Sequence, residues 1–252
     1  MEKIFLDGAK NVRDLGNTKT KDGKIIKRKR YIRSNKLVNL SEADKKKLKD
    51  EYDLSLIIDL RTSREIEEKP DPVIEGVEWL HMPIIRMTRA GISHEKEERK
   101  SNPDPSKIPD MRNLYVEFVE EDYCIEMFKK TIHTILNHKS GSVLWHCSEG
   151  KDRCGMVSVF MEYILGVDTD DIMEDYLETN VYSIPESKKE QKRVLADTGN
   201  EELAEKVGRL IIADRSYLQA ALDYVDKNYG GMDNFIKEKL MVTSDMVPEV
   251  FE

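Results

Sequence analysis

The sequence predicts an α/β fold in which a central, mostly parallel sheet is flanked by helices, and three features predict it. First, the apolar run 142–145 indicates a short buried strand, and a loop joins it to the apolar segment 156–165, which indicates a buried helix ending at Gly166. Second, the run 54–60 indicates another buried strand. Third, helical periodicity at 111–138 and through most of the chain beyond Gly166 predicts a helical C-terminal third.

Local signals place the other elements in chain order. An Asp-Gly pair at 22–23 between two extended runs indicates a hairpin turn, and Ser41 with Asp44 forms a capping-box pattern at a helix start. The predicted elements are a β-rich hairpin over 1–37, a helix over 41–52, the strand 54–60, a short helix over 63–68 that Thr62 caps, a strand over 79–84, one long helix over 111–138, a helix over 168–182 that stops near Pro185, and helices over 186–212, 214–229 and 232–240.

The segment 86–110 does not fit this pattern, because it is polar, carries three prolines and is too long for an ordinary connection. We expect a lid or a partly disordered insertion there. No linker or internal repeat interrupts the rest of the chain, so we expect one domain over 1–252, with the helical C-terminal third packed on the sheet.

Composition excludes several classes of protein. The net charge of −8 makes nonspecific binding to nucleic acid improbable, and no apolar stretch approaches the ~18 residues of a membrane span. The N-terminus shows no signal-peptide pattern, and three cysteines do not suggest a disulfide framework. These features favour the cytoplasm, with export by a route that needs no N-terminal signal as the alternative.

The loop between the strand at 142 and the helix at 156 carries the chemistry. Its sequence is His-Cys-Ser-Glu-Gly-Lys-Asp-Arg-Cys-Gly, from 146 to 155. Backbone N–H groups of a tight loop, together with the first turn of a helix, bind a dianion and favour a thiolate at Cys147. Arg153 can place a planar guanidinium on two phosphate oxygens, and Gly150 lets the backbone approach the anion. This set describes phosphoryl transfer through a cysteinyl-phosphate.

The loop resembles the signature loop of cysteine-dependent protein tyrosine phosphatases. With its Lys-Asp-Arg-x-Gly run, it is similar to one branch, the bacterial tyrosine/serine phosphatases that often also act on phosphoinositides. The strings Asn-Val-Arg-Asp-Leu-Gly at 11–16 and Asp-Leu-Arg-Thr at 59–62 resemble the same branch. The resemblance implies a cysteine-phosphatase-like fold, Cys147 as nucleophile and Arg153 on the phosphate. The remaining phosphate-binding candidates in the loop are Ser148, Glu149, Gly150, Lys151 and Cys154.

Two buried positions are candidates for supporting roles. His146 precedes the nucleophile, and we expect it to orient backbone groups and support the thiolate rather than act as a base, because a thiolate needs none. Asp59 ends the strand 54–60 and could hold Arg153 or Arg61, or could be an ordinary strand-end residue. The other histidines show no metal-ligand spacing, so we expect neither metal nor cofactor.

The general acid has two sources in the sequence. Many tyrosine phosphatases use an aspartate on a separate loop, and here only Asp104 and Asp110 of the segment 86–110 could serve. The resemblance to the Lys-Asp-Arg branch favours Asp152 instead. The alternative role for Asp152 is charge compensation at the helix N-terminus.

Cys154 departs from the branch, which usually has threonine or serine there. A thiol is a weaker donor than a hydroxyl, which could affect breakdown of the phosphoenzyme, and a second thiol near Cys147 could form a protective disulfide. The simpler alternative is that Cys154 fills the small site with its sulfur turned into the helix.

The sequence therefore predicts a phosphatase acting on phosphotyrosine, with phosphoserine/threonine and phosphoinositides as further substrates. The alternatives are a sulfurtransferase or arsenate reductase that uses the loop cysteine, and a catalytically silent phospho-binding module. The partner is a phosphoprotein or a phosphoinositide. A basic cluster near the N-terminus is either a solvated hairpin or a surface for peripheral contact with acidic lipid; it consists of Lys21, Lys24, Lys27, Arg28, Lys29, Arg30 and Arg33.

Overall fold

A central sheet of mostly parallel strands organises the protein, as the sequence predicts. The computed structural model describes residues 1–86 and 108–251. In the described residues the strand order is β1-β2-β3-β6-β4-β5, with β1 and β2 antiparallel to their neighbours and the other four strands parallel. The strands are β1 (Glu2–Lys3), β2 (Arg13–Asp14), β3 (Tyr31–Ser34), β4 (Leu54–Asp59), β5 (Glu78–His81) and β6 (Ser142–His146).

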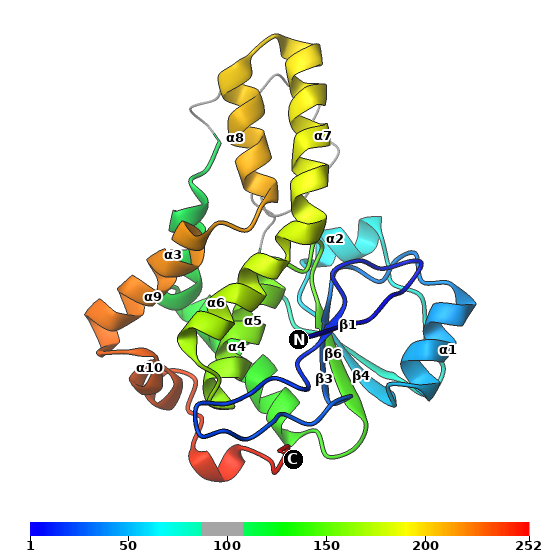
Figure 1. The fold of residues 1–252 in the computed structure, drawn as a ribbon, viewed down its shortest axis with the longest axis vertical. Helices are drawn as coiled ribbons and strands as arrows, with labels where there is room; N and C mark the ends of the chain where they lie inside the picture. The colour runs from blue at the N-terminus through cyan, green and yellow to red at the C-terminus, as the bar shows by residue number, and fades with distance from the viewer. Residues whose placement is uncertain (87–107, 252) are drawn as a thin grey trace.

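Helices cover both faces of this sheet (Figure 1). They are α1 (Glu42–Asp50), α2 (Ser63–Glu68), α3 (Met111–Glu120), α4 (Asp122–Asn137), α5 (Arg153–Ile164), α6 (Thr169–Glu178), α7 (Asn180–Thr198), α8 (Glu201–Ile211), α9 (Arg215–Tyr229) and α10 (Met232–Glu238). Helix α1 lies on one face of the sheet, and α4 and α5 lie on the other. The α/β fold class is thereby confirmed.

The alternation of side chains along the central strands divides the interior into two cores. Trp145 of β6 faces the larger core, which contains α3, α4, α5, α9 and α10, whereas Leu144 faces the smaller core beneath α1. In β4, Ile58 faces the larger core and Ile57 faces the smaller core. Since β4 and β6 are covered on both faces, they read as continuous apolar runs in the sequence.

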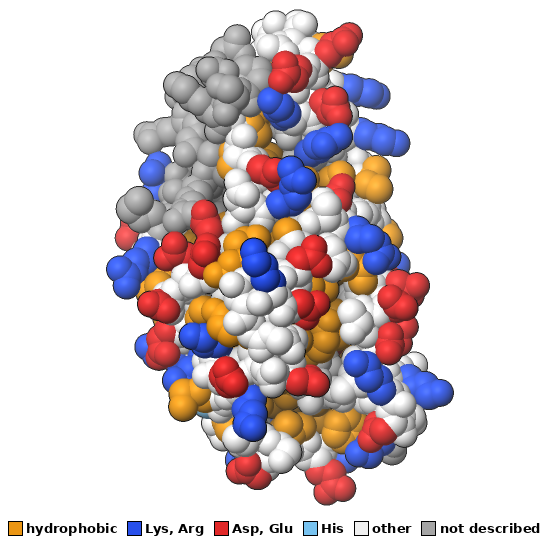
Figure 2. All heavy atoms as spheres, turned by 90° about the vertical axis from the view of Figure 1, so that its left-hand side faces the viewer, with side chains coloured by type: hydrophobic (Ala, Val, Ile, Leu, Met, Phe, Trp, Pro, Cys, Tyr) orange, Lys and Arg blue, Asp and Glu red, His pale blue; other side chains and the backbone are white. Residues whose placement is uncertain are grey.

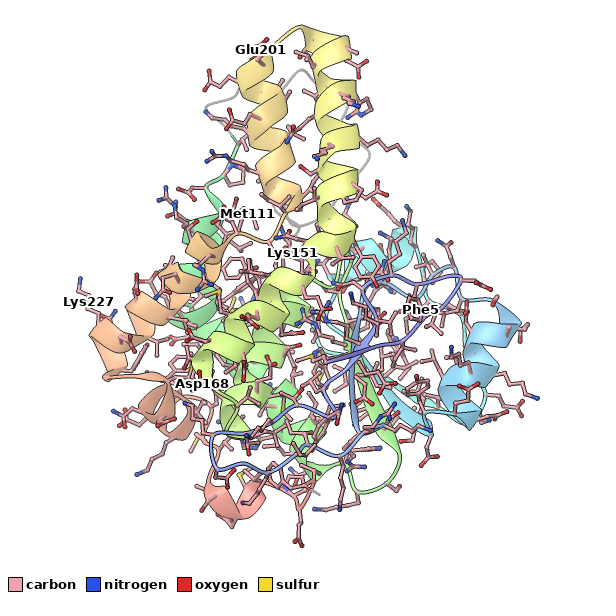
Figure 3. All side chains as sticks on the ribbon, in the orientation of Figure 1. Phe5, Met111, Lys151, Asp168, Glu201 and Lys227 are labelled. Carbon is pink, nitrogen blue, oxygen red and sulfur yellow. The ribbon has the colours of Figure 1, made fainter. Side chains whose placement is uncertain are left out.

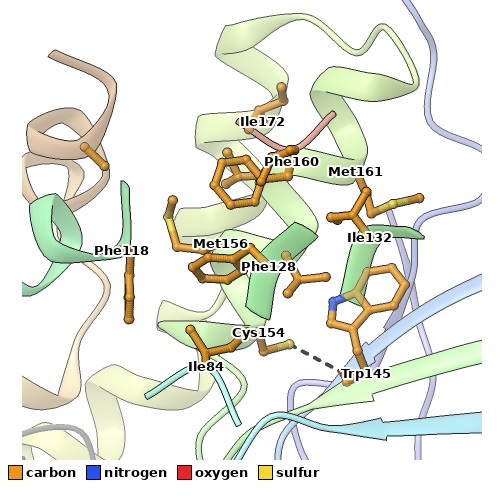
Figure 4. Close-up of a cluster of buried hydrophobic side chains, with 14 of the residues drawn as sticks. Ile84, Phe118, Phe128, Ile132, Trp145, Cys154, Met156, Phe160, Met161 and Ile172 are labelled. Carbon is orange, nitrogen blue, oxygen red and sulfur yellow. Dashed lines mark hydrogen bonds between the residues drawn. The ribbon is translucent and has the colours of Figure 1, made fainter. Parts of the chain in front are cut away.

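A chain of aromatic rings ties the helices of the larger core together (Figure 4). Phe128 of α4 lies between Phe118 of α3 and Phe160 of α5, with ring-centroid distances of 5.7 and 5.2 Å, and Phe160 stacks on Phe235 of α10 at 5.8 Å. These separations are typical of favourable aromatic pairs. The packing holds α5, and with it the end of the signature loop, in a fixed place.

The single long helix predicted over 111–138 is wrong, because the chain contains two helices there. Glu121 separates α3 from α4 with an extended backbone, at ψ 122°. Helix α3 packs on α9, whereas α4 packs on α5. Both helices keep an apolar stripe, so the sequence pattern runs through the break without showing it.

Pro185 does not end a helix, which corrects a second prediction. Helix α6 ends at Glu178, and α7 runs from Asn180 through Pro185 to Thr198. A proline removes the hydrogen bond to the carbonyl four residues earlier, that of Val181. Val181 is 56% exposed, so water can replace that bond.

Helices α7 and α8 form a hairpin that extends away from the sheet (Figure 1). Gly199, at φ 65°, ends α7, and Asn200 caps α8. The two helices enclose their own small core around Val194, Leu203 and Ala204. The expectation that the whole C-terminal third packs on the sheet is therefore wrong for this hairpin, although α9 and α10 do join the larger core.

The N-terminal segment contains less β-structure than the sequence predicts. The turn at Asp22-Gly23 is confirmed, since Lys19 pairs with Ile25 across it, but most of the chain between β2 and β3 is irregular. Two members of the basic cluster are not available at the surface: Arg33 is buried, and Arg30 donates to the carbonyls of Gly141 and His138. Residues 87–107, most of the predicted lid or insertion, lie outside the described residues.

Charges of both signs mix on the face that Figure 2 shows. Acidic and basic side chains are interspersed there, with small hydrophobic areas between them. Among the described residues of this face, the basic side chains form no continuous stripe of the kind that binds nucleic acid. No helix in the described part of the chain is long and apolar enough to cross a membrane.

One buried carboxyl group on α5 has an unusual environment. Glu162 is 1% exposed, and neither of its carboxyl oxygens has a hydrogen-bond partner among the described residues. Burial, and then the charge of Asp175, raise its pKa well above the usual range, against the opposing effect of Arg33 and Arg13. Its surroundings therefore favour the protonated, neutral form of Glu162.

We expect Glu162→Gln to remove a pH-dependent loss of stability. Because the folded-state pKa of Glu162 is raised above its unfolded value of about 4.3, the unfolded chain releases this proton at lower pH, so rising pH favours unfolding. The variant should gain stability relative to the wild type as the pH rises from 4 to 8, measured by urea denaturation. The exposed Glu249→Gln serves as the control. A difference between Glu162→Gln and wild type that does not change with pH would contradict this account.

Candidate active site

The signature loop lies at the carboxyl end of the central strands. It connects His146, the last residue of β6, to Arg153, the first residue of α5. In the sheet, His146 is paired with Ser34 of β3 and with Asp59 of β4, so three strands end at the loop. This edge is where open α/β sheets bind ligands. Figure 3 shows Lys151 of the loop below the α7–α8 hairpin. The predicted strand-loop-helix arrangement is confirmed.

Three consecutive carbonyls of the loop are held by residues from the N-terminal part of the chain. The carbonyl of Ser148 accepts from the backbone N–H of Lys36 at 3.3 Å, that of Glu149 from Asn11 Nδ2 at 3.5 Å, and that of Gly150 from Asn11 Nδ2 at 3.1 Å and Arg33 Nη2 at 2.9 Å. In a trans peptide the C=O and the following N–H point in opposite directions, and the described chain has no cis peptide. The next three N–H groups, those of Glu149, Gly150 and Lys151, therefore point away from these anchors, as in an anion-binding nest.

Gly150 is required at its position. Its φ is 67°, and a Cβ atom there would lie 2.7 Å from the carbonyl oxygen of Ser34 and 2.8 Å from the backbone N of Asn35. The left-handed conformation and the close approach to β3 both exclude a larger residue. The loop is thus pressed against the end of β3.

Arg153 is held by a partner that sequence reasoning missed. Its Nη1 and Nη2 donate to the two carboxylate oxygens of Glu65 at 2.6 and 2.9 Å, and Ser148 Oγ also donates to this carboxylate. Burial alone would raise the pKa of Glu65, but the charge and hydrogen bonds of Arg153 outweigh it and lower that pKa to about 2. The pair fixes the guanidinium plane before any anion arrives.

The position of Glu65 follows from a local signal. Thr62 caps α2 in a capping box with Glu65, as predicted for Thr62, so the Glu65 carboxylate faces the start of α2. Because α2 begins just after the end of β4, this start lies beside the loop. A capping box that follows a strand ending at the site could have indicated Glu65 in the sequence.

Asp59 holds Arg61, not Arg153. The Asp59 carboxylate accepts from Arg61 Nε at 2.9 Å and Nη2 at 2.6 Å, and Arg61 Nη2 also lies 3.0 Å from Asp71 Oδ2. Asp59, Asp71 and His146 lie close enough together to suggest a metal site. The Arg61 guanidinium, however, already supplies a cation to both carboxylates.

His146 lies beside this acidic pair and directly precedes Cys147 in the chain. Its Nε2 is 2.9 Å from Asp71 Oδ2, and its Nδ1 is 3.3 Å from the carbonyl of Cys147. Burial would lower the pKa of His146, but the charges of Asp59 and Asp71 outweigh burial and raise that pKa. The buried acidic pair therefore favours the protonated form of His146.

Asp152 does not act as a helix cap through its side chain. It occupies the N-cap position of α5 without a side-chain capping bond, and its Oδ1 instead accepts from Tyr115 OH at 2.8 Å. Tyr115 in turn accepts from Tyr176 OH at 2.8 Å. Two buried tyrosines from α3 and α6 thus fix the orientation of the Asp152 carboxyl group.

The other two candidates for the general acid are Asp110 and Asp104. Asp110 caps α3 and forms an ion pair with Arg112, which, through its hydrogen bonds, lowers the pKa of Asp110. A carboxyl group with a lowered pKa is a poor proton donor. Asp104 lies outside the described residues.

Two charged side chains of the loop are engaged with neighbouring elements. Lys151 Nζ donates to the carbonyls of Leu210 and Ile212, at 2.6 and 3.3 Å, at the end of α8. Glu149 Oε1 lies 3.1 Å from Lys36 Nζ. The Lys151 side chain thus connects the loop to α8 and also lies 3.3 Å from Asp152 Oδ1, and the Glu149 side chain connects the loop to the segment after β3.

Cys154 turns its sulfur into the core. Its Sγ donates to the carbonyl of Trp145 at 3.6 Å, beneath the loop, and burial raises its pKa to about 12 (Figure 4). This position agrees with the simpler alternative, in which Cys154 fills a small site. Cys147 is 2% exposed in the absence of an anion.

Comparison with known proteins agrees with the geometry of this site. The tyrosine phosphatase family matches residues 4–250, so the chain belongs to that family. The protein is therefore a phosphatase of the tyrosine-phosphatase class.

Three relatives match most of the chain. Triple specificity protein phosphatase PtpB of Mycobacterium tuberculosis is 25% identical, over 92% of this chain and 92% of that protein. A Cupriavidus necator protein whose name assigns it provisionally to the tyrosine-protein phosphatases is 27% identical, over 95% of this chain and 84% of that protein. A tyrosine-protein phosphatase of Nostoc commune is 26% identical, over 82% of this chain and 68% of its own length.

We expect Glu65→Gln to weaken both stability and activity. Removing one partner of a buried ion pair costs about 3–5 kcal/mol, and the freed guanidinium loses its orientation, so kcat/KM on an aryl phosphate should fall at least about tenfold. Urea denaturation and steady-state kinetics measure the two effects.

The control for Glu65 is Glu68→Gln on the same helix, where the carboxylate pairs with the surface residue Arg64. Because the pKa of Glu65 falls from 4.5 to about 2, its stabilising effect should be complete above pH 4.5 and lost as the pH falls toward 2. Equal behaviour of the two variants would contradict the role of Glu65.

Proposed function

We propose that this phosphatase hydrolyses phosphotyrosine through a cysteinyl-phosphate on Cys147. The observation that carries the proposal is the set of carbonyls from Ser148 to Gly150 held behind the loop, which turns the following N–H groups toward one anion site. Arg153, oriented by Glu65, supplies the fork for two phosphate oxygens. Residues 1–252 act as a single phosphatase domain, with no cofactor.

In the first step the Cys147 thiolate attacks phosphorus, and the bond to the leaving oxygen breaks. Asp152 gives its proton to that oxygen, so the alcohol leaves neutral. In the second step Asp152 takes a proton from water, the water oxygen attacks phosphorus, and the P–S bond breaks. The products are the alcohol and inorganic phosphate, and both Cys147 and Asp152 return to their starting forms.

The orientation of Asp152 supports its role as the acid. Tyr115 donates to one oxygen of the Asp152 carboxyl group and so fixes its orientation. Asp152 lies in the loop itself, so no other segment has to supply the acid. Asp152 also lies in an ion pair, since Lys151 Nζ is 3.3 Å from its Oδ1, so an ion pair alone does not separate the candidates. Asp110 is the weaker candidate because it caps α3 outside the loop and its hydrogen bonds with Arg112 lower its pKa.

One relative is named a triple specificity phosphatase, and we extend the proposal to phosphoserine/threonine and phosphoinositides on that likeness.

The cysteines Cys124, Cys147 and Cys154 are all free and buried. A thiolate nucleophile requires reducing conditions, which is why we place the protein in the cytoplasm.

We expect Cys147→Ser to reduce turnover of phosphotyrosine at least a thousandfold while the melting temperature stays within a few degrees of wild type, because serine is not ionised at neutral pH. Arg153→Lys should lose about a hundredfold, since a point charge cannot replace the bidentate fork. Steady-state kinetics with phosphotyrosine measures both. Trapping of a thiophosphate ester on Cys147 by acid quench and mass spectrometry checks the intermediate.

Residual activity of Cys147→Ser above a tenth of wild type would rule out the covalent mechanism. Turnover of thiosulfate or arsenate in place of phosphotyrosine would favour a sulfurtransferase or an arsenate reductase. Phosphopeptide binding without turnover would favour a silent binding module.

We expect Asp152→Asn to slow substrates with poor leaving groups about 10²–10⁴-fold, while an activated aryl phosphate is affected far less, because only a poor leaving group needs the proton. The comparison uses phosphoserine peptide or an alkyl phosphate against p-nitrophenyl phosphate. Asp110→Asn is the matched control. If Asp110→Asn shows the selective loss and Asp152→Asn does not, the acid is Asp110.

A further inference from the structure

Asn11 adopts a strained backbone directly behind the signature loop. Its φ is 56°, in the left-handed region that non-glycine residues rarely occupy, and its side chain is 2% exposed. Asparagine tolerates this region better than most residues. A strained residue persists where its surroundings determine its conformation, and such residues concentrate at functional sites.

The side-chain amide of Asn11 bridges the loop to the elements behind it. Nδ2 donates to the carbonyl of Gly150 at 3.1 Å, with longer contacts to the carbonyl of Glu149 at 3.5 Å and to Thr179 Oγ1 at 3.4 Å. Oδ1 accepts from Arg13 Nη1. The amide is thereby fixed on both sides, with its N–H groups directed at the loop.

Two buried arginines behind Asn11 share one carboxylate. Arg13 Nε lies 3.0 Å from Asp175 Oδ1, and Arg33 Nη1 pairs with Asp175 Oδ2. A further carboxylate, that of the partly exposed Glu178, lies 3.8 Å from Arg13. Both arginines are fully buried, so this ion-pair layer is rigid, and Arg33 extends from it to the carbonyl of Gly150.

We propose that Asn11 is a positioning residue that orients the oxyanion-binding N–H groups of the signature loop. The inference rests on the proposed function, because it concerns how that site holds phosphate. By binding the carbonyls of Glu149 and Gly150, Asn11 keeps the N–H groups of Gly150 and Lys151 directed at the anion.

An alternative conformation of the loop explains why the loss of Asn11 should weaken anion binding. If the peptide between Gly150 and Lys151 rotates, its carbonyl replaces its N–H in the cradle. A carbonyl oxygen repels both a phosphate dianion and the Cys147 thiolate. Arg33 holds the same carbonyl alone in the absence of Asn11, so the loop should remain folded but bind anions less tightly.

The test uses Asn11→Gly and the matched control Asn17→Gly. Asn17 also has a left-handed backbone, at φ 64°, but it is exposed. Glycine fits φ > 0 and increases the flexibility of the unfolded chain equally in both variants. The full-length protein is studied, with inorganic phosphate as the ligand, by calorimetry and by competitive inhibition of aryl-phosphate turnover.

We expect Asn11→Gly to bind phosphate about tenfold more weakly than Asn17→Gly, the loss of one to two buried hydrogen bonds. The pH of half-maximal alkylation of Cys147 by iodoacetamide should rise, and KM should rise together with a fall in kcat. A merely structural role would lower the melting temperature but leave phosphate affinity and the alkylation profile of the folded protein unchanged, and that result would overturn the inference.

Asn11→Asp provides a second variant if Asn11→Gly does not fold. Aspartate keeps the acceptor for Arg13 and the shape of the side chain, but it loses both donor hydrogens to the loop. Phosphate affinity equal to wild type in Asn11→Asp would also overturn the inference. If the folded wild type neither binds phosphate nor turns over aryl phosphate, the proposed function itself fails, and the inference fails with it.

Discussion

The candidate site depends on the direction of three consecutive backbone carbonyls. Between Ser148 and Gly150 each carbonyl is bound from behind, and the polypeptide can then offer its N–H groups to an anion only on the other side. No side chain in the loop has to supply this part of the binding. The loop, the end of β3 and Asn11 therefore behave as one unit, and Gly150 is the position where this unit leaves no room for a Cβ atom.

Three buried arginines around the loop are each paired with a carboxylate. Arg153 is paired with Glu65, Arg33 with Asp175 and Arg61 with Asp59, and every one of these groups is buried. A buried guanidinium without such a partner would be costly, and the pairs fix its orientation as well as stabilise it. In the proposed mechanism, an arriving phosphate would therefore meet donors that need little reorganisation, which is the condition for electrostatic stabilisation of a transition state.

The sequence predicts those features that depend on neighbouring residues. The strand-loop-helix around Cys147, the buried strand before Asp59 and the caps at Ser41 and Thr62 all follow from local patterns, and all are present. The break at Glu121, the helix that continues through Pro185 and the pairing of Arg153 with Glu65 depend on which distant surfaces pack together. A periodic pattern continues across a one-residue break, and spacing along the chain cannot show which carboxylate reaches an arginine, so these features escaped prediction.

The anchoring of the loop by the N-terminal segment also sets an order for folding. Asn11 bonds to a carbonyl 139 residues further along the chain, and Arg13 bonds to a carboxylate 162 residues away. During synthesis Asn11 and Arg13 leave the ribosome long before their partners Gly150 and Asp175, and contacts between distant residues form slowly. The strand-loop-helix around Cys147 is local in sequence, whereas the bonds that hold its carbonyls and the arginines behind them require the chain to be complete through Asp175. A fragment that ends before α6 would therefore contain the whole signature loop but lack the carboxylate that pairs with Arg13 and Arg33.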